Sequence, residues 1–136
     1  MISIIILAYN CEDYINLCIE SCLSQTRRDL IEVIVINDGS TDRTKKILLK
    51  YKKNIKIFNR KNMGIEKSFN FALSKIKGDF FVRLDADDLL HKNYIEYLYK
   101  HLNKKYDFFY SNYDIINHNN LKISHSNLPK FSINEI

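Results

Sequence analysis

The chain has no apolar run long enough to cross a membrane, because charged residues interrupt each run at about the length of a strand. Its N-terminus, MISIIILA, has no basic segment ahead of the apolar residues, so we expect no signal peptide. Both absences argue against an exported protein. We therefore expect a cytoplasmic location, with attachment to the inner face of the cell membrane left open.

Cysteine is scarce, and the three residues lie in or just before the first expected helix: Cys11, Cys18 and Cys22. The last two share an apolar stripe at helical spacing, which places their Cβ atoms about 5–6 Å apart. That separation is too long for a relaxed disulfide, and no histidine lies nearby to complete a zinc site. We expect buried, reduced thiols, which fit a reducing compartment.

Length and charge limit the remaining classes. The 136 residues are 46% hydrophobic, enough for one domain with a sizeable core, so we assign 1–136 to a single domain. The formal charge of +5 favours anionic partners such as lipid or a phosphorylated substrate. The abundance of Lys, Asn, Ile and Tyr also follows from AT-biased coding, so we expect no nucleic-acid partner. Peripheral association with an anionic membrane stays open.

Apolar runs predict strands, and segments with helical spacing of apolar residues lie between them. The expected strands cover 3–8, 31–36, 54–59, 79–84, 107–116 and 121–124, and the expected helices cover 11–25, 43–52, 65–77 and 93–103. We expect Asn10 to cap the first helix and Gly78 to end the third as a C′ glycine. The alternation predicts an α/β fold with a mainly parallel sheet.

In such a sheet the carboxyl ends of the strands meet at one rim, where open α/β sheets bind ligands. That rule brings together three polar strand ends that are distant in sequence: Tyr9-Asn10, Asp38-Gly39 and Asp85-Ala86-Asp87. Their convergence predicts a ligand site at the rim.

The segment Leu84-Asp85-Ala86-Asp87-Asp88 places three carboxylates within four positions after an apolar strand. Neighbouring carboxylates repel one another, and a hard cation with oxygen ligands, Mn²⁺ or Mg²⁺, relieves that repulsion. A divalent-metal site, with a phosphate as companion ligand, is therefore the first interpretation.

These carboxylates have three other interpretations. Asp87 or Asp88 could simply cap the helix that follows. An EF-hand is disfavoured because Leu90 occupies the position that requires glycine. The haloacid-dehalogenase-like phosphatases place a similar Asp-x-Asp motif after their first strand, whereas here it comes late in the chain.

Four segments carry a family resemblance: SIIILAYN, VINDGSTDRT, NMGIEKSFNFAL and GDFFVRLDADD. In this order and spacing, up to about Ile123, they resemble the family-two glycosyltransferases of the GT-A fold, which invert configuration at the transferred sugar. The resemblance implies a Rossmann-like, mainly parallel sheet flanked by helices and a nucleotide-diphosphate-sugar donor, first of all a UDP-sugar. It also implies Mn²⁺ or Mg²⁺ as cofactor, a glycan or lipid-linked acceptor, and polysaccharide biosynthesis.

Site residues follow from matching positions in the family's motifs. The expected nucleotide-binding residues are Ala8, Tyr9, Asp38, Asn62, Gly64 and Asp85, and the expected metal ligands are Asp87 and Asp85. Tyr9 would stack on the base and Asp38 would accept a hydrogen bond from it. Arg83, inside an apolar strand, is costly to bury alone, and we favour a structural ion pair over contact with the donor.

The chain departs from the family pattern at Asn37, where many relatives have Asp. It departs again at Ser68-Phe69-Asn70, where Ala-Arg-Asn is usual, so that a cation near the diphosphate is missing. Relatives supply the catalytic base from a later segment, so we expect it beyond Ile136, with Asp88 as a weaker candidate. The chain would then be the truncated, donor-binding half of the domain. A catalytically silent nucleotide-binding or interaction module is the alternative, and a homodimer formed through the truncated sheet stays open.

Overall fold

The computed structural model describes residues 1–102 and 108–128, which fall into two compact units, Met1–His101 and Leu102–Ile136. The elements of the first unit are β1 (Ile2–Ala8), α1 (Ile15–Leu23), η1 (Arg28–Leu30), β2 (Ile31–Asp38), α2 (Thr44–Leu48), η2 (Leu49–Tyr51), β3 (Lys56–Arg60), α3 (Ile65–Leu73), β4 (Phe80–Asp85) and α4 (Tyr94–His101). The second unit contains β5 (Asp114–Ile116) and β6 (Lys122–His125).

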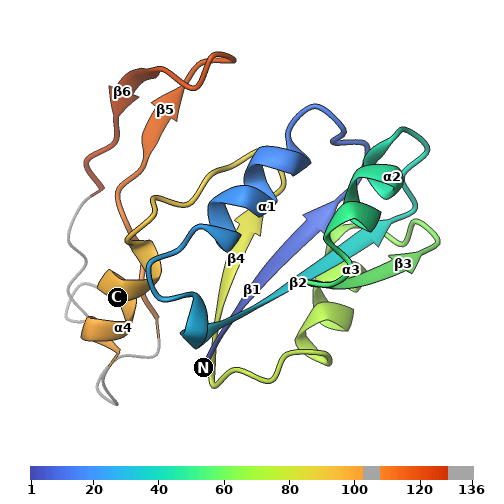
Figure 1. The fold of residues 1–136 in the computed structure, drawn as a ribbon, viewed down its shortest axis with the longest axis horizontal. Helices are drawn as coiled ribbons and strands as arrows, with labels where there is room; N and C mark the ends of the chain where they lie inside the picture. The colour runs from blue at the N-terminus through green and yellow to red at the C-terminus, as the bar shows by residue number, and fades with distance from the viewer. Residues whose placement is uncertain (103–107, 129–136) are drawn as a thin grey trace. The chain divides into compact units, whose positions relative to one another are not determined.

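The first unit is built on a four-stranded parallel sheet with the strand order β3-β2-β1-β4 (Figure 1). The register aligns the strand ends: Ala8 lies beside Asn37, and Leu7 lies beside Asp85. Three polar strand ends therefore share one edge, as expected from the parallel order.

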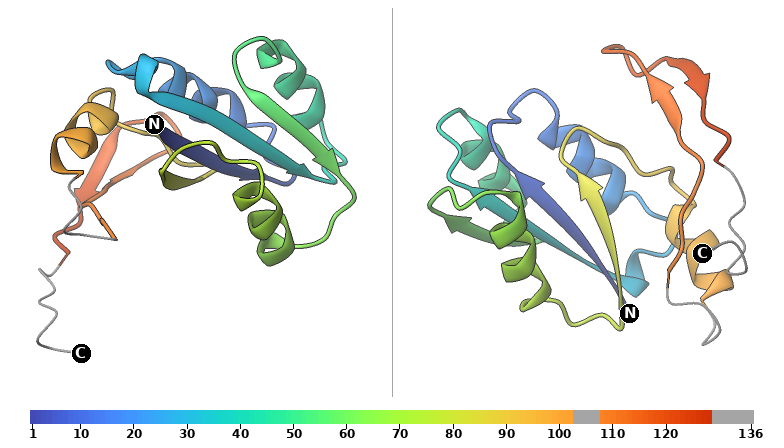
Figure 2. Two further views of the ribbon diagram at one scale, coloured as in Figure 1. Left: turned by 90° about the horizontal axis from the view of Figure 1, so that it is seen from below. Right: turned by 180° about the vertical axis from the view of Figure 1, so that it is seen from behind.

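Helices cover both faces of this sheet, with α3 on one side and α1 and α2 on the other (Figure 2). The central strands β1 and β2 are therefore buried on both faces, which explains their unbroken isoleucine and valine runs. Under α3, the buried Ile5, Ile34 and Ile36 pack with Ala72 and a rim of half-buried aromatic side chains. This core holds the strand ends in place.

The expected α/β architecture with a parallel sheet is confirmed, and β1, β2 and β4 lie within two residues of their predicted bounds. Several predicted elements are longer than the observed ones. The first helix, predicted over 11–25, covers Ile15–Leu23, and the second, predicted over 43–52, covers Thr44–Leu48 and is followed by η2. The helix predicted over 65–77 ends at Leu73, and of the strand predicted over 107–116 only Asp114–Ile116 forms, residue 107 lying outside the described residues. Residue 103, the predicted end of the fourth helix, also lies outside them.

Gly78 is not the C′ residue of α3, because that helix ends at Leu73 with Ser74 as its C-cap. A Cβ at Gly78 would lie 2.7 Å from the carbonyl oxygen of Met1 and 2.8 Å from the nitrogen of Ser3. Glycine is required here by close backbone approach at the start of β4.

The second unit is an antiparallel hairpin of β5 and β6. Asn117 shapes its turn, since its side-chain oxygen accepts hydrogen bonds from the backbone nitrogens of Asn119 and Leu121. Across the strands, Asp114 pairs with Lys122 and His125. These contacts define the hairpin register.

Candidate functional site

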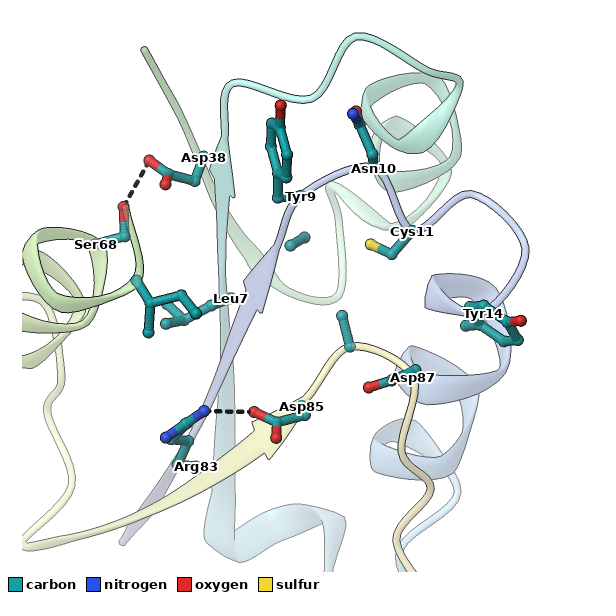
Figure 3. Close-up of a pocket in the computed structure, with 13 residues that line it drawn as sticks. Leu7, Tyr9, Asn10, Cys11, Tyr14, Asp38, Ser68, Arg83, Asp85 and Asp87 are labelled. Atoms are coloured by element: carbon teal, nitrogen blue, oxygen red, sulfur yellow. Dashed lines mark hydrogen bonds and ion pairs between the residues drawn. The ribbon is translucent and has the colours of Figure 1, made fainter. Parts of the chain in front are cut away.

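A cavity of about 450 Å³ lies at the carboxyl edge of the parallel sheet (Figure 3). Its walls come from the ends of β1, β2 and β4 and from the start of α3. Among the residues predicted from sequence, those that line it are Ala8, Tyr9, Asp38, Asp85 and Asp87. Asn62 and Gly64 do not line the cavity, and the nitrogen of Gly64 donates a hydrogen bond to Asp38 Oδ2. The strand ends predicted to converge thus meet at this cavity, and their role in binding a ligand stays a prediction.

The loop after β1 is braced by the loop after β2. Asn10 has a φ of 47°, and its side-chain oxygen accepts a hydrogen bond from the backbone nitrogen of Thr41 (2.8 Å). Its own nitrogen donates to Ser40 Oγ (3.1 Å). These bonds fix the backbone beside Tyr9, whose side chain is 53% exposed at the cavity.

The prediction that Asn10 caps the first helix is wrong. The N-cap position is Tyr14, which makes no side-chain capping bond. The side-chain oxygen of Asn10 is engaged by the loop after β2 instead, so a contact between segments about thirty residues apart replaces the local cap.

Asp38 is 5% exposed and holds the turn that precedes α3. Its Oδ1 accepts hydrogen bonds from the nitrogen of Met63 (3.0 Å) and from Ser68 Oγ (2.7 Å). Its Oδ2 accepts one from the nitrogen of Gly64 (2.9 Å). A carboxylate offers about four acceptor sites, so one on Oδ2 is left for a ligand. The bond from Asp38 to a base stays a prediction.

Two positions that depart from the family pattern have structural roles that sequence reasoning missed. The buried Asn37 donates from Nδ2 to Asn59 Oδ1 (2.8 Å) and accepts from the nitrogen of Ser40 (3.2 Å). An aspartate could not donate the first of these bonds. Ser68 supplies the buried hydroxyl that binds Asp38. The motif spacing contains no signal for either partner.

Arg83 and Asp85 form an ion pair at the end of β4, with 2.9 Å between Nη2 and Oδ1. The expected ion pair is present, but the expected burial of Arg83 is wrong, since its side chain is 50% exposed. The preference for this pair over contact with the donor stays a prediction. Every second side chain of β4, those of Phe81, Arg83 and Asp85, is exposed and lies on the same face of the strand. Both partners line the cavity.

Asp87 points into the cavity from the turn after β4 (Figure 3). In the described part of the chain, no hydrogen bond or ion pair engages its carboxylate. Asp88 follows, and its nitrogen donates to the carbonyl of Asp85 (3.0 Å). Partial burial and the charges of Asp87 and Asp85 raise the pKa of Asp88. Helix capping is excluded for both, because α4 begins six residues after Asp88, at Tyr94.

The carboxylates of Asp85 and Asp87 suit a divalent cation that also binds a phosphate of the ligand. Asp87 is free, and Asp85 keeps one oxygen outside its ion pair. The described residues contain no group of three or more His, Cys, Asp or Glu side chains arranged to hold a metal alone. Mg²⁺ and Mn²⁺ sites commonly combine one or two carboxylates with substrate phosphates and water. The residues therefore fit such an ion.

The cysteines divide into two groups. Cys18 and Cys22 are buried free thiols on α1, as expected, and the Cys18 thiol donates to the carbonyl of Asp85 (3.5 Å). Cys11 is only half-buried and lines the cavity, so the prediction of full burial is wrong for it. Burial, together with the nearby carboxylates of Asp42 and Asp87, raises the pKa of Cys11, which keeps it a neutral thiol.

The family model for glycosyl transferase family 2 matches residues 3–135. The chain belongs to this family. The family match extends the resemblance seen in the four motifs to nearly the whole chain. No helix of the described residues is long and apolar enough to cross a membrane.

Two curated relatives illustrate the similarity of this family member. An uncharacterized glycosyltransferase from Rickettsia typhi is 41% identical over 104 residues, which cover 76% of this chain and 32% of the relative. The chondroitin synthase of Pasteurella multocida is 42% identical over 99 residues, which cover 71% of this chain and 10% of that protein. The chain thus spans about a third or less of the length of these relatives.

Solved structures share the fold of this family member. TarS 1-349 from S. aureus in complex with UDP superposes with a TM-score of 0.68 and 33% identity, covering 73% of this chain and 31% of that one. The mannosyltransferase PcManGT from Pyrobaculum calidifontis in complex with GDP-Man and Mn²⁺ gives a TM-score of 0.58 and 25% identity, covering 65% and 28%. The expected GT-A fold is confirmed.

Proposed function

We propose that this chain is the donor-binding part of an inverting, metal-dependent glycosyltransferase that uses a nucleotide-diphosphate sugar, with a UDP-sugar as first candidate. One observation carries the proposal: Tyr9, Asp38, Asp85 and Asp87 border a single cavity at the carboxyl edge of a parallel sheet. The UDP bound to TarS and the GDP-Man and Mn²⁺ bound to PcManGT support it. The acceptor is a glycan or a lipid-linked glycan, in line with the chondroitin synthase relative.

Each wall of the cavity has its own task in this proposal. The exposed ring of Tyr9 offers a flat face on which a base stacks. Asp38 keeps the turn at Gly64 in place and offers its remaining acceptor site to the base. Ala8, which lines the cavity, and Asn62, which does not, complete the predicted nucleotide contacts.

Asp87, with Asp85, would hold the divalent cation. That ion supplies Lewis-acid neutralisation of the charge that develops on the departing diphosphate. Asp87 is suited to the task because no protein cation in the described residues neutralises it, so its full charge faces the cavity. Inversion further needs a carboxylate that takes the proton of the acceptor hydroxyl. Asp88 is the candidate among the described residues.

The test is binding of UDP by calorimetry, with and without Mn²⁺, to the unmodified chain and to an Asp87→Asn variant. We expect Mn²⁺ to strengthen UDP binding, and the variant to lose the metal-dependent part while keeping its melting temperature. Asp13→Asn serves as the matched control, since Asp13 is an exposed acid that does not line the cavity. Failure of the folded, unmodified chain to bind either UDP or GDP would overturn the proposal.

Transfer itself is a separate measurement. Incubation with radiolabelled UDP-sugars and a panel of glycan acceptors distinguishes an active transferase from a silent nucleotide-binding module. Binding of UDP without transfer or release of sugar would favour the silent module. A homodimer remains a prediction, which light scattering checks directly.

A further inference from the structure

Basic residues are segregated along the chain. Between Arg43 and Ile65 there are nine lysines and arginines and no aspartate or glutamate. Two of the nine have carboxylate partners, since Arg43 pairs with Glu12 and Lys56 with Glu32. The side-chain ammonium groups of six lysines in this segment have no hydrogen bond or ion pair in the parts of the chain that the structure describes. This unbalanced charge calls for an anionic partner.

Five of these lysines form one outward surface on α2, η2 and the turn that follows. We call it the lysine face, and it consists of Lys45, Lys46, Leu49, Lys50, Lys52 and Lys53. All six side chains are exposed, and Leu49 is 51% exposed among the charges. The inward side of the same segment buries Thr44 and Leu48 against the rest of the unit.

The acids next to this segment form no ion pair with its exposed lysines among the described residues. Glu12 pairs with Arg43, and Glu20 accepts a hydrogen bond from the neutral hydroxyl of Tyr51 (2.6 Å). The side chain of Tyr51 is half-buried. The lysine face therefore presents lysine charge around one apolar side chain, with no exposed aromatic ring on it.

We propose that the lysine face is a docking surface for an anionic lipid bilayer. Lysines near such a surface add their attractions without needing fixed geometry, and an apolar residue among them can enter the interface. Single-stranded nucleic acid is bound instead through stacking on aromatic side chains and through arginine, and this face has neither. The proposal does not depend on the donor chemistry, because the residues involved do not line the cavity.

The direct test is co-sedimentation of the 136-residue chain with vesicles. We expect binding to vesicles of phosphatidylglycerol and phosphatidylcholine, none to phosphatidylcholine alone, and loss of binding as salt is raised. Equal binding to both vesicle types would overturn the proposal. So would tighter binding to a single-stranded oligonucleotide than to the anionic vesicles under the same salt.

Two triple variants separate a local surface from net charge. Lys46, Lys50 and Lys53 changed together to Gln should weaken vesicle binding about a hundredfold, or about fivefold for each lysine. Lys75, Lys77 and Lys92 changed to Gln remove the same charge from other exposed positions and should cost less than about threefold. Equal losses in the two variants, at equal melting temperatures, would show that only net charge matters and overturn the assignment.

Leu49→Ser tests the apolar component at constant charge. We expect a loss of about threefold to tenfold in vesicle binding, because one buried aliphatic side chain is exchanged for a polar one. UDP binding should be the same in all three variants, which separates this proposal from the proposed function. Unchanged vesicle binding in Leu49→Ser would overturn insertion of this side chain.

Discussion

The two edges of the parallel sheet both carry carboxylates, yet they are in opposite states. At the amino edge, Glu32 accepts hydrogen bonds from Ser3 Oγ (2.6 Å) and from the nitrogen of Lys77, and it pairs with Lys56. At the carboxyl edge, Asp87 has no partner in the described residues and faces a cavity. A satisfied carboxylate stabilises the fold, whereas an unsatisfied one is available to a ligand.

Asp38 shows that one edge can hold both kinds of group. It lies at the carboxyl edge and lines the cavity, but three of its acceptor sites already serve the turn before α3. Position at the ligand-binding edge is therefore insufficient to assign a binding role. The number of protein donors around each carboxylate separates the tasks.

The largest expected effect comes from a change at the carboxyl edge of the sheet. Asp87→Asn should weaken Mn²⁺-dependent UDP binding by at least about a hundredfold, because an amide is a poor ligand for a hard cation. The free energy of unfolding should change by less than about 0.5 kcal/mol, since no protein contact is lost. Calorimetry and urea unfolding give the two values. A strongly destabilised variant would show that Asp87 has a structural partner.

The next largest effect is expected from a change at the amino edge of the sheet. Glu32→Gln should lower the free energy of unfolding by about 2 kcal/mol, because the ammonium of Lys56 and the donors around it lose a charged acceptor. Urea unfolding measures the change, and UDP binding should be retained. Glu66→Gln is the matched control on the exposed start of α3, and it should change stability by less than about 0.5 kcal/mol. Equal effects of the two changes would contradict a special role for the amino edge.

The same carboxylate gives a pH signature. Burial raises the pKa of Glu32, but bonds from Lys56, Ser3 and Lys77 outweigh it and hold the pKa below its ordinary value. Its contribution is therefore complete above the unfolded-state pKa of about 4.3 and is lost as pH falls through the lower folded-state value. We expect the stability gap between the unmodified chain and Glu32→Gln to narrow below about pH 4. A gap that is constant with pH would contradict this assignment.

A smaller effect is expected from a change that separates the two roles of Asp38, holding the turn before α3 and binding the nucleotide. Ser68→Ala removes the buried hydroxyl bond to Asp38 and should cost about 1 to 2 kcal/mol of unfolding free energy. Nucleotide affinity should fall only a few fold, because Met63 and Gly64 still hold the carboxylate. Urea unfolding and UDP titration give both numbers. Ser74→Ala, an exposed hydroxyl at the end of α3, is the control.

The parts predicted from sequence are those that depend on local pattern. The apolar runs of β1 and β2 predicted these strands correctly, because both faces of each strand are buried. Because the carboxyl ends of parallel strands share one edge, the position of Asp85 and Asp87 at that edge was also predictable. The end of α3 was not predictable in this way. The nitrogen of Lys77, placed in that helix from sequence, binds Glu32 forty-five positions away.

The same reason explains the errors at the site. The side chain of Asn10 could either cap the nearby helix or accept a hydrogen bond from a distant loop. In the structure it accepts one from the nitrogen of Thr41. Asn37 and Ser68 were recognised as departures from the family pattern, but their partners Asn59 and Asp38 lie 22 and 30 positions away. Pairs at such separations follow from the fold and cannot be read from spacing along one chain.

Arg83 pairs with Asp85 at the carboxyl edge of the sheet. A change at Arg83 therefore tests whether Asp85 acts as a ligand for the cation or as a structural carboxylate. An exposed ion pair contributes about 0–1 kcal/mol, so Arg83→Gln should leave the free energy of unfolding nearly unchanged. The variant frees Asp85 and removes a competing cation, and we expect Mn²⁺ to bind about twofold to fivefold more tightly. Titration of Mn²⁺ by electron paramagnetic resonance measures this effect without nucleotide. A fall in UDP affinity in the absence of metal would instead show that Arg83 contacts the donor, and Asp85 would then belong with the structural carboxylates.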